Sequence, residues 1–356
     1  MKKICIDVRM IKKNISGIGN YEKNIIKILF DIMPDWYFYL IGDKNNLENN
    51  GIKETKRIKI IQCSIDIYTI KEQFVIYKLI PKDINLFWCP HFNIPFFYNK
   101  KMLVTIHDVC HLAIPEAVGG KFKSFCARIY FEFIRYKAKC ILTVSDFSKK
   151  EIEKYLHYEN IPIIVSRLGV DKEWFSFGNK KKPYILFVGN IKPHKNLITL
   201  IKAFKEIENK IDLNLVIVGK KEGFINTDNK VLNFESKRII FTDFVDDRTL
   251  KQLYAEAEIF VFPSIYEGFG LPILEAMASN TLVISSNAAS LPEIGLDGPI
   301  YYNPLDYKEL SNIILKVMVN NKIKEKHIKR SAVIAKKYSW ENTAMIVKNT
   351  IEKYSE

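Results

Sequence analysis

The stretch Ser264-Ile-Tyr-Glu-Gly-Phe-Gly-Leu-Pro-Ile-Leu-Glu275 decides the interpretation of this chain. The apolar run Ile259–Phe262 directly before it predicts a buried strand, and Pro272 stands where the first helical residue is expected. A strand, a glycine loop and a helix start place free backbone amides at one point, where they favour a phosphate oxygen. We therefore predict an anion site whose amides belong to Gly270 and Leu271.

Two carboxylates accompany this predicted anion site. Glu267 lies in the loop, and Glu275 lies about one turn into the helix. Both side chains are therefore expected to face one crevice.

Length and composition indicate the number of domains, the kinds of partner and the compartment. The chain has 356 residues, of which 48% are hydrophobic, so two domains are expected. Its formal net charge of +14, larger in the first half, suits anionic partners such as a nucleotide, a nucleic acid or an anionic membrane. The six cysteines show no Cys-x-x-Cys spacing, which predicts a reducing, cytoplasmic compartment and no structural zinc. Asp7 interrupts any hydrophobic signal core, and no run approaches a spanning helix.

Short apolar runs alternate with helical patterns along the chain, which predicts an α/β fold with parallel sheets covered on both faces by helices. The pattern restarts near residue 183, after the polar segment 177–182. We expect a first domain over 1–176, a second over 183–338 and a closing helix from 339 to 356. The strands are expected at Ile4–Val8, Tyr37–Ile41, Ile58–Ile61, Asn85–Trp88, Leu103–Ile106, Ile141–Val144, Tyr184–Val188, Leu213–Val218, Ile239–Phe241, Ile259–Phe262 and Leu282–Ser285.

Three further segments follow predicted strands and carry candidate binding residues. Gly17 and Gly19 follow the first strand and allow close approach of backbone to a ligand. His107 follows the strand at 103–106, at the carboxyl edge where open α/β sheets bind ligands. Lys195 ends the loop that begins at Val188 and is placed to meet a phosphate as a point charge.

Taken together, these motifs resemble the retaining glycosyltransferases of family 4, from Asp7 to the closing helix and most specifically over 262–293. The resemblance implies the GT-B architecture, in which two Rossmann-like domains face each other across a cleft and the closing helix over 339–356 crosses back to the first domain. It implies a nucleotide-diphosphate sugar donor, a saccharide or lipid-linked saccharide acceptor and transfer of a hexose with retention. Relatives of this kind suggest mannose from GDP-mannose, used in cell-surface polysaccharide synthesis.

The resemblance also assigns roles to individual residues. It implies that Glu267 binds the donor sugar, Glu275 the ribose, and Lys195 the phosphate, while His107 contacts the transferred sugar. Of these, His107, Glu267 and Lys195 are the expected catalytic residues. The implied donor-binding residues are Gly17, Gly19, Asn190, Lys192, Lys195, Val245, Glu267, Gly268, Phe269, Gly270, Leu271 and Glu275. Many relatives carry arginines where this chain has Asn190 and His194, so Lys192 is expected to supply the missing charge.

No metal and no cofactor are expected, because no Asp-x-Asp pair stands in a suitable loop. Two other classes stay open: a sugar-nucleotide epimerase of the same fold and a basic nucleic-acid-binding protein. The cations are dispersed and no RNA-binding signature is present, which argues against nucleic acid as a partner. A dinucleotide oxidoreductase lacks its third glycine here.

The segment 121–139 is predicted to form one helix with a core stripe at Phe122, Phe125, Ile129, Phe133 and Tyr136. The opposite face carries Ala127, Phe131, Ile134 and Ala138, bordered by cations. That second face suits an anionic membrane surface, which would place the protein on the inner face of the cell membrane. A helix packed on both faces inside the domain is the alternative.

Overall fold

The computed structural model describes residues 1–13, 17–177, 180–219 and 236–356 of the chain. It divides the chain into two compact units. Unit 1 comprises Met1–Ala113, Lys121–Gly169 and Ser339–Glu356, and unit 2 comprises Ile114–Gly120 and Val170–Tyr338. The chain first passes from unit 1 to unit 2 for a short segment, and then returns. The expected linker at 177–182 lies within unit 2 and includes two residues outside the described ranges.

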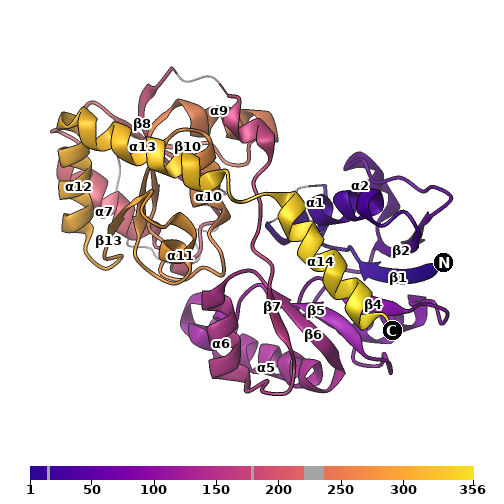
Figure 1. Ribbon diagram of the computed structural model, residues 1–356. Coiled ribbons are helices and arrows are strands. Elements are labelled where there is room, and N and C mark those ends of the chain that lie inside the picture. The colour runs from indigo at the N-terminus through magenta and orange to yellow at the C-terminus, as the bar shows by residue number, and fades with distance from the viewer. Residues whose placement is uncertain (14–16, 178–179, 220–235) are drawn as a thin grey trace. The chain divides into compact units, whose positions relative to one another are not determined.

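Unit 1 is built on a seven-stranded parallel sheet with the order β3-β2-β1-β4-β5-β6-β7 (Figure 1). Its strands are β1 (Lys2–Asp7), β2 (Trp36–Gly42), β3 (Ile58–Gln62), β4 (Leu86–Cys89), β5 (Met102–Thr105), β6 (Ala138–Thr143) and β7 (Ile163–Val165). Its helices are α1 (Gly17–Ile32), α2 (Lys44–Asn49), α3 (Ile70–Leu79), α4 (Cys110–Ala113), α5 (Gly120–Lys137), α6 (Asp146–Leu156) and α14 (Trp340–Tyr354).

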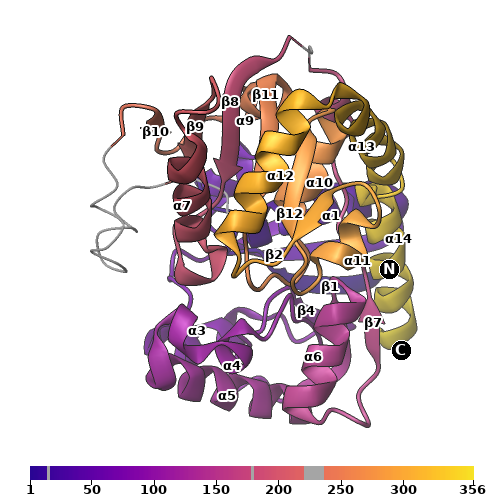
Figure 2. The same ribbon diagram turned by 90° about the vertical axis from the view of Figure 1, so that its left-hand side faces the viewer.

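Helices cover both faces of this sheet. Figure 2 shows α3, α5 and α6 on one face, where they enclose a core that includes Ile76, Phe131 and Ile152. Helices α1 and α14 pack against each other on the other face. The hydroxyl of Thr343 in α14 donates to the carbonyl of Arg167 at 2.6 Å, which fixes the last helix to the segment that follows β7.

Unit 2 contains a six-stranded parallel sheet with the order β10-β9-β8-β11-β12-β13. Its strands are β8 (Lys182–Val188), β9 (Asn214–Val218), β10 (Ile239–Phe241), β11 (Ala257–Phe262), β12 (Leu282–Ser286) and β13 (Ile300–Tyr302). The α-helices are α7 (Leu197–Ile207), α9 (Asp247–Glu256), α10 (Leu271–Ala278), α11 (Leu291–Gly295), α12 (Tyr307–Val319) and α13 (Asn321–Ala335). The short 3-10 helices are η1 (Pro115–Val118), η2 (Lys172–Phe175) and η3 (Pro193–Lys195).

The predicted strands are all present, and the predicted parallel α/β architecture is confirmed. In the described ranges the prediction missed two strands, β7 and β13, each three residues long at the edge of its sheet. Such short edge strands carry too few residues for a periodic pattern. Among the helices of the described residues, none is both long and apolar enough to cross a membrane.

The predicted orientation of α5 is wrong. The side chains that face the core belong to Ala127, Phe131 and Ile134, whereas Phe122 and Phe125 of the expected core stripe are 77% and 62% exposed. Both faces of this helix are apolar, so periodicity alone could not choose between them. Tertiary packing selects the buried side, because Ala127, Phe131 and Ile134 join the core cluster of unit 1.

Candidate functional site

The strand order of unit 2 locates its binding edge. The strands β8, β9 and β10 follow one another toward one edge of the sheet, and β11, β12 and β13 follow one another toward the other edge. The direction of winding therefore reverses between the neighbouring strands β8 and β11. In open parallel sheets the connecting loops diverge at such a point, and ligands bind at the carboxyl ends of the two strands there. The loops that leave β8 and β11 carry Lys195 and Glu267. The sequence therefore places both candidate residues at the binding edge of one sheet.

These two side chains meet in the structure. The Lys195 ammonium lies 2.5 Å from Glu267 Oε1, and the two side chains are 17% and 12% exposed. The ammonium also lies 5.5 Å from the centre of the Phe262 ring, at the end of β11. The pair therefore holds a cation at the binding edge in a fixed position, with limited access of water.

Asn196 holds the lysine loop against the glycine loop, a role that the sequence reasoning missed. Its amide donates to the carbonyls of Pro263 at 3.1 Å and Pro304 at 2.8 Å. The backbone of Ile265 donates to the carbonyl of His194 at 2.8 Å, which joins the same two loops. Asn196 has a φ of 53°, a left-handed conformation that asparagine adopts more readily than most residues. An asparagine directly before a helix was the available signal.

The glycine loop between β11 and α10 is held from behind by Ser290. This buried hydroxyl lies 2.9 Å from the carbonyls of both Glu267 and Phe269 and shares its proton between them. Gly270 has a φ of +99° and ends the loop at the start of α10. The helix begins at Leu271 with Pro272 in its first turn, so the amides of Gly270 and Leu271 have no partner within the helix and suit an anion.

Replacing Gly270 by Ala is expected to disrupt this loop. A Cβ at this position would lie 2.5 Å from Leu291 Cδ2, and the positive φ adds backbone strain. We expect a loss of about 2 to 4 kcal/mol in the free energy of unfolding, measured by urea denaturation. Gly120→Ala is the matched control, since Gly120 has a φ of +87° but no atom near its Cβ position. Equal losses in both variants would show that the Leu291 contact is unimportant.

Glu275 lies on α10 in surroundings different from those of Glu267. Burial raises the pKa of the Glu275 carboxyl to about 7, against a lowering effect of the nearby Tyr254 hydroxyl, while Asp171 and Asp247 raise it further. In the described residues, no hydrogen bond or ion pair joins Glu275 to Lys195 or Glu267. The carboxylate is therefore poised to gain hydrogen-bond donors, such as a pair of hydroxyls, that stabilise its ionised form.

The remaining candidates of unit 2 lie outside this network. Asn190 and Lys192 are exposed, and Val245 is partly buried beside Phe244, which is 59% exposed. The Lys192 carbonyl accepts a hydrogen bond from the Lys195 amide at 2.9 Å, so its backbone shapes the turn. In the described part of the chain, no hydrogen bond or ion pair joins the Lys192 side chain to Lys195 or Glu267. Its role in phosphate binding stays a prediction.

His107 lies in unit 1 at the carboxyl end of β5. Its Nε2 is 3.0 Å from the carbonyl of Pro90, which assigns the proton to Nε2 and leaves Nδ1 as an acceptor. Burial lowers the pKa of His107 to about 4, so the ring is neutral at physiological pH. The ring of Tyr21 packs edge-on against it, 5.0 Å away. Asp108 Oδ1 accepts from the Cys110 amide at 2.9 Å and thereby caps α4.

Gly17 and Gly19 begin α1 after β1. Gly17 is exposed with open space around it, whereas Gly19 is buried. Residues 14–16, which precede them in the predicted loop, lie outside the described ranges. Gly17, Gly19 and His107 belong to unit 1, and one site shared with Lys195 and Glu267 of unit 2 stays a prediction.

A buried polar network occupies the corresponding reversal point of unit 1, between β1 and β4. The Arg9 guanidinium contacts Asp7 at 2.7 Å and Glu72 at 2.8 Å, with all three side chains at most 3% exposed. Although burial by itself raises the pKa of Asp7, Arg9 and His91 lower it below its usual range. The Asn93 amide donates to both oxygens of Glu72 at 2.8 Å. No sequence motif pointed to this network.

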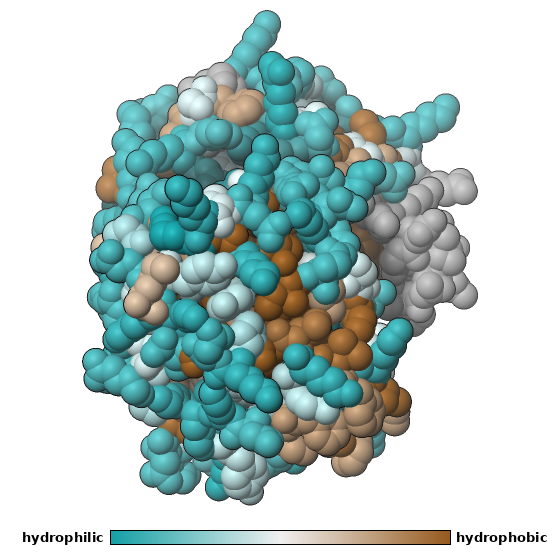
Figure 3. Space-filling model, turned by 90° about the vertical axis from the view of Figure 1, so that its right-hand side faces the viewer, coloured by the Kyte–Doolittle hydropathy of each residue, from teal (hydrophilic) through white to brown (hydrophobic). Residues whose placement is uncertain are grey.

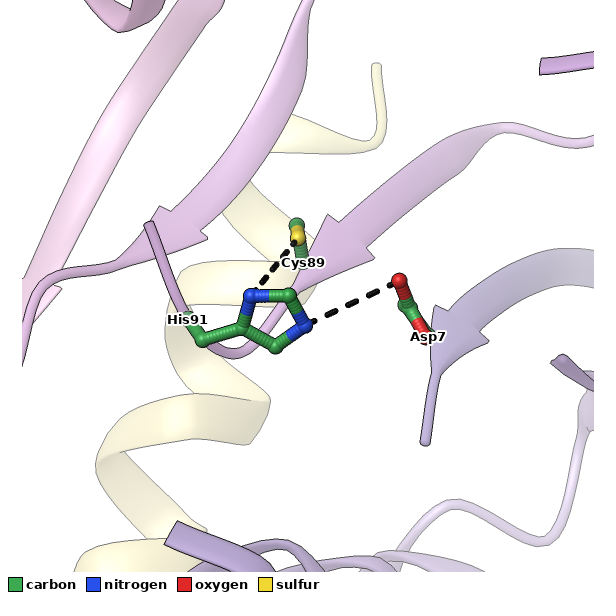
Figure 4. Close-up of side chains that lie close together, drawn as sticks. All are labelled: Asp7, Cys89 and His91. Atoms are coloured by element: carbon green, nitrogen blue, oxygen red, sulfur yellow. Dashed lines mark hydrogen bonds and ion pairs between the residues drawn. The ribbon is translucent and has the colours of Figure 1, made fainter. Parts of the chain in front are cut away.

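Asp7, Cys89 and His91 of this network lie close enough together to resemble a metal site (Figure 4). His91 Nδ1 already accepts from the backbone N–H of Asn93 at 3.1 Å, so the ring proton is on Nε2, which faces Asp7 at 3.7 Å. Burial raises the pKa of the Cys89 thiol well above its usual value, whereas a metal requires the thiolate. The donor set therefore fits a structural hydrogen-bond network better than a metal.

Comparisons with known proteins agree with this architecture. The solved structure of HepE from Anabaena in complex with UDP and glucose matches 99% of this chain and 100% of that one, with a TM-score of 0.74 and 16% sequence identity. This likeness, together with the two parallel sheets, shows the GT-B fold of two Rossmann-like domains.

The sequence relatives identify the family. A family model described as glycosyl transferases group 1 matches residues 171–333. O-antigen chain mannosyltransferase B of Escherichia coli is 30% identical over 269 residues, which are 71% of this chain and 70% of that protein. O-antigen chain mannosyltransferase RfbU of Salmonella typhimurium is 33% identical over 232 residues, which are 64% of this chain and 63% of that protein. The chain belongs to the group 1 glycosyltransferases and is an enzyme of that class.

Proposed function

We propose that this enzyme is a retaining transferase of family 4 that moves a hexose from a nucleotide-diphosphate sugar to a glycan or lipid-linked saccharide. The first candidate donor is GDP-mannose, and the reaction would serve surface polysaccharide synthesis on the cytoplasmic face of the membrane. The observation that carries this proposal is the Lys195–Glu267 pair at the reversal point of unit 2. The names of the two O-antigen mannosyltransferases support mannose as the hexose.

The chemistry of donor cleavage explains the residues at this edge. When the glycosyl-phosphate bond breaks, negative charge develops on the departing diphosphate and positive charge on the anomeric carbon. Lys195 and the amides at Gly270 and Leu271 would stabilise the diphosphate. Glu267 would bind hydroxyls of the donor sugar, and in the free protein it keeps the ammonium in place. No cofactor or metal is assigned to this step.

Other residues would complete donor and acceptor binding. Glu275 would accept hydrogen bonds from the ribose, and the segment at Val245 would meet the base. Neutral His107 would contact the transferred sugar through Nδ1, with Gly17 and Gly19 beside the diphosphate. Because its ring is neutral at physiological pH, His107 would act as a hydrogen-bond partner rather than as a cation.

Two measurements test the function. Thermal-shift screening of nucleoside diphosphates and their sugars should single out one donor, since a ligand that binds only the folded state stabilises it. Release of free nucleoside diphosphate should then increase when a saccharide acceptor is added. Conversion of the donor sugar without acceptor would instead identify an epimerase. Salt-sensitive duplex binding with no response to any nucleotide sugar would favour a nucleic-acid-binding protein.

Nucleotide affinity is expected to increase with pH through the pKa of Glu275. Ribose hydroxyls donate to the ionised carboxylate, and the pKa of about 7 means that the group is largely protonated at pH 6 and ionised at pH 8. We therefore expect affinity to fall by up to about tenfold per pH unit below 7, measured by titration calorimetry with the nucleoside diphosphate. Glu275→Gln should bind more weakly at pH 8 and lose this pH dependence.

In the free enzyme, the free energy of unfolding should fall as the pH rises, whereas nucleotide affinity should rise. Because the folded pKa of Glu275 is raised, its contribution to folding is lost as the pH rises from about 4.5 to about 7. Glu256→Gln provides the control, since hydrogen bonding by Gln252 and pairing with Lys182 outweigh burial and lower the pKa of Glu256. The Glu256 variant should keep the wild-type pH dependence of binding. If nucleotide affinity depends on pH in Glu275→Gln as it does in the wild type, Glu275 does not bind the ribose.

A further inference from the structure

Unit 1 exposes six aromatic side chains on α3, α5 and the segment before β5. We call them the aromatic face. Each is between 38% and 77% exposed, and the set is Phe74, Phe97, Phe122, Phe125, Phe133 and Tyr136. Figure 3 shows one face of the molecule, on which apolar residues gather into an area with hydrophilic side chains around it. Exposed apolar surface of this kind usually marks an interaction site.

The aromatic face is joined across the two helices. The Phe97 ring lies 5.2 Å from Phe74 on α3, and its neighbour Phe96 stacks on Phe133 of α5 at 4.2 Å. Gln73 Oε1 accepts from the Phe96 amide at 2.8 Å, which fixes this segment to α3. The rings are therefore presented by a supported surface rather than by separate loops.

The exposed rings of α5 lie outside the buried core cluster of unit 1. Together with the exposed Ile129 they recur at intervals of three and four residues, on the side of the helix opposite Ala127, Phe131 and Ile134. Those three buried residues are the ones through which α5 contributes to the core cluster. The exposed stripe is therefore available to a partner outside the domain.

The charges around the rings indicate the charge of the partner surface. Exposed cations outnumber exposed acids on α3 and α5. The one exposed acid is Glu132, and the six exposed cations are Lys71, Lys78, Lys121, Lys123, Arg128 and Arg135. Aromatic rings bordered by lysine and arginine suit the headgroup zone of an anionic bilayer. A second copy of this chain would instead bring the same cations into opposition, which disfavours a dimer through this face.

We propose that the aromatic face docks onto an anionic lipid surface, with the rings at headgroup depth and the cations against lipid phosphates. The sequence pattern had assigned membrane contact to the other side of α5, which the structure shows to be buried. The docking surface goes beyond the proposed transferase activity. Its test needs neither donor nor acceptor, so the two proposals can fail independently.

A tryptophan placed on the aromatic face tests the orientation directly. All four native tryptophans are buried, at most 6% exposed, so an added one reports on its own position. We expect Phe125→Trp fluorescence to shift to the blue with phosphatidylglycerol vesicles and to be quenched by brominated lipid. Val319→Trp, at an 87% exposed position on α12, is the control and should show neither change. Equal quenching at both positions would overturn the proposed face.

Binding strength tests the two components. Phe122→Ala with Phe125→Ala should weaken vesicle co-sedimentation roughly tenfold or more, since each exposed ring contributes apolar area. Lys121→Glu with Lys123→Glu should weaken it by a similar factor at low salt and less at high salt. The matched controls are Leu305→Ala with Val319→Ala and Lys322→Glu with Lys326→Glu, at exposed positions of unit 2, and should bind as wild type does.

Three results would overturn the proposal. The first is equal binding of the wild type to neutral phosphatidylcholine and anionic vesicles, and the second is binding to neither. The third is a dimer, seen by sedimentation velocity, that the Phe122 and Phe125 substitutions dissociate while vesicle binding is absent. That last result would assign the aromatic face to a second copy of the chain.

Discussion

Replacing Lys195 by Met is expected to lower the rate of nucleoside diphosphate release by roughly a hundredfold to a thousandfold, or about 3 to 4 kcal/mol of barrier. The ammonium is held 2.5 Å from Glu267 at the reversal point of unit 2, where the departing diphosphate is expected. Methionine keeps much of the side-chain volume but removes the charge. The effect should fall mainly on kcat with the donor identified by thermal shift, measured at saturating acceptor.

Three variants separate this role from a structural one. Lys195→Arg should restore part of the rate, because it keeps a cation near the same position. Lys202→Met, at an exposed position of α7, should leave the rate unchanged. Combining Lys195→Met with Glu267→Gln should cost less than the sum of the two losses, since the pair acts as a unit. A wild-type rate in Lys195→Met would contradict the assignment of the phosphate-binding cation.

Replacing Arg9 by Met is expected to destabilise unit 1 by about 3 to 5 kcal/mol, because it leaves Asp7 and Glu72 buried without their common cation. All three side chains are almost completely buried, so water cannot replace the guanidinium without disrupting the packing. Chemical denaturation followed by circular dichroism measures the change. The two carboxylates belong to β1 and α3, so the loss should be greatest in the half of the sheet around β1.

The control for Arg9 is an exposed ion pair in the same unit. Lys12 lies 2.8 Å from Asp66, with the two side chains 48% and 75% exposed, and Lys12→Met should change stability by less than about 0.5 kcal/mol. Adding Glu72→Gln to Arg9→Met should recover part of the loss, because it removes one of the unpaired charges. A loss as small as that of Lys12→Met would show that the network is not required for folding.

The sequence was sufficient for the alternation of strands and helices and for the parallel sheets. Runs such as Ile259–Phe262 are continuously apolar because both faces of the strand are covered, and this pattern needs no tertiary information. The glycine loop was also predictable, since Pro272 and the positive φ required at Gly270 are local properties.

The partners of individual side chains were not predictable in the same way. Asn196 and Ser290 hold the loop through carbonyls that lie 67 and 23 residues away in the chain. Their hydrogen bonds exist only after β8, β11 and β12 have paired in the sheet. The raised pKa of Glu275 likewise depends on burial by neighbouring elements that its own segment does not reveal.

By itself, the sequence determined the two-domain α/β plan, the family resemblance and the loops that carry Lys195 and Glu267, because periodicity and turn chemistry act over a few residues. Only the tertiary structure decided which side of α5 is exposed, which buried charges surround Arg9 and that Lys195 contacts Glu267 directly. These features depend on contacts between distant segments. Their energy comes from burial and pairing that arise when the sheets assemble.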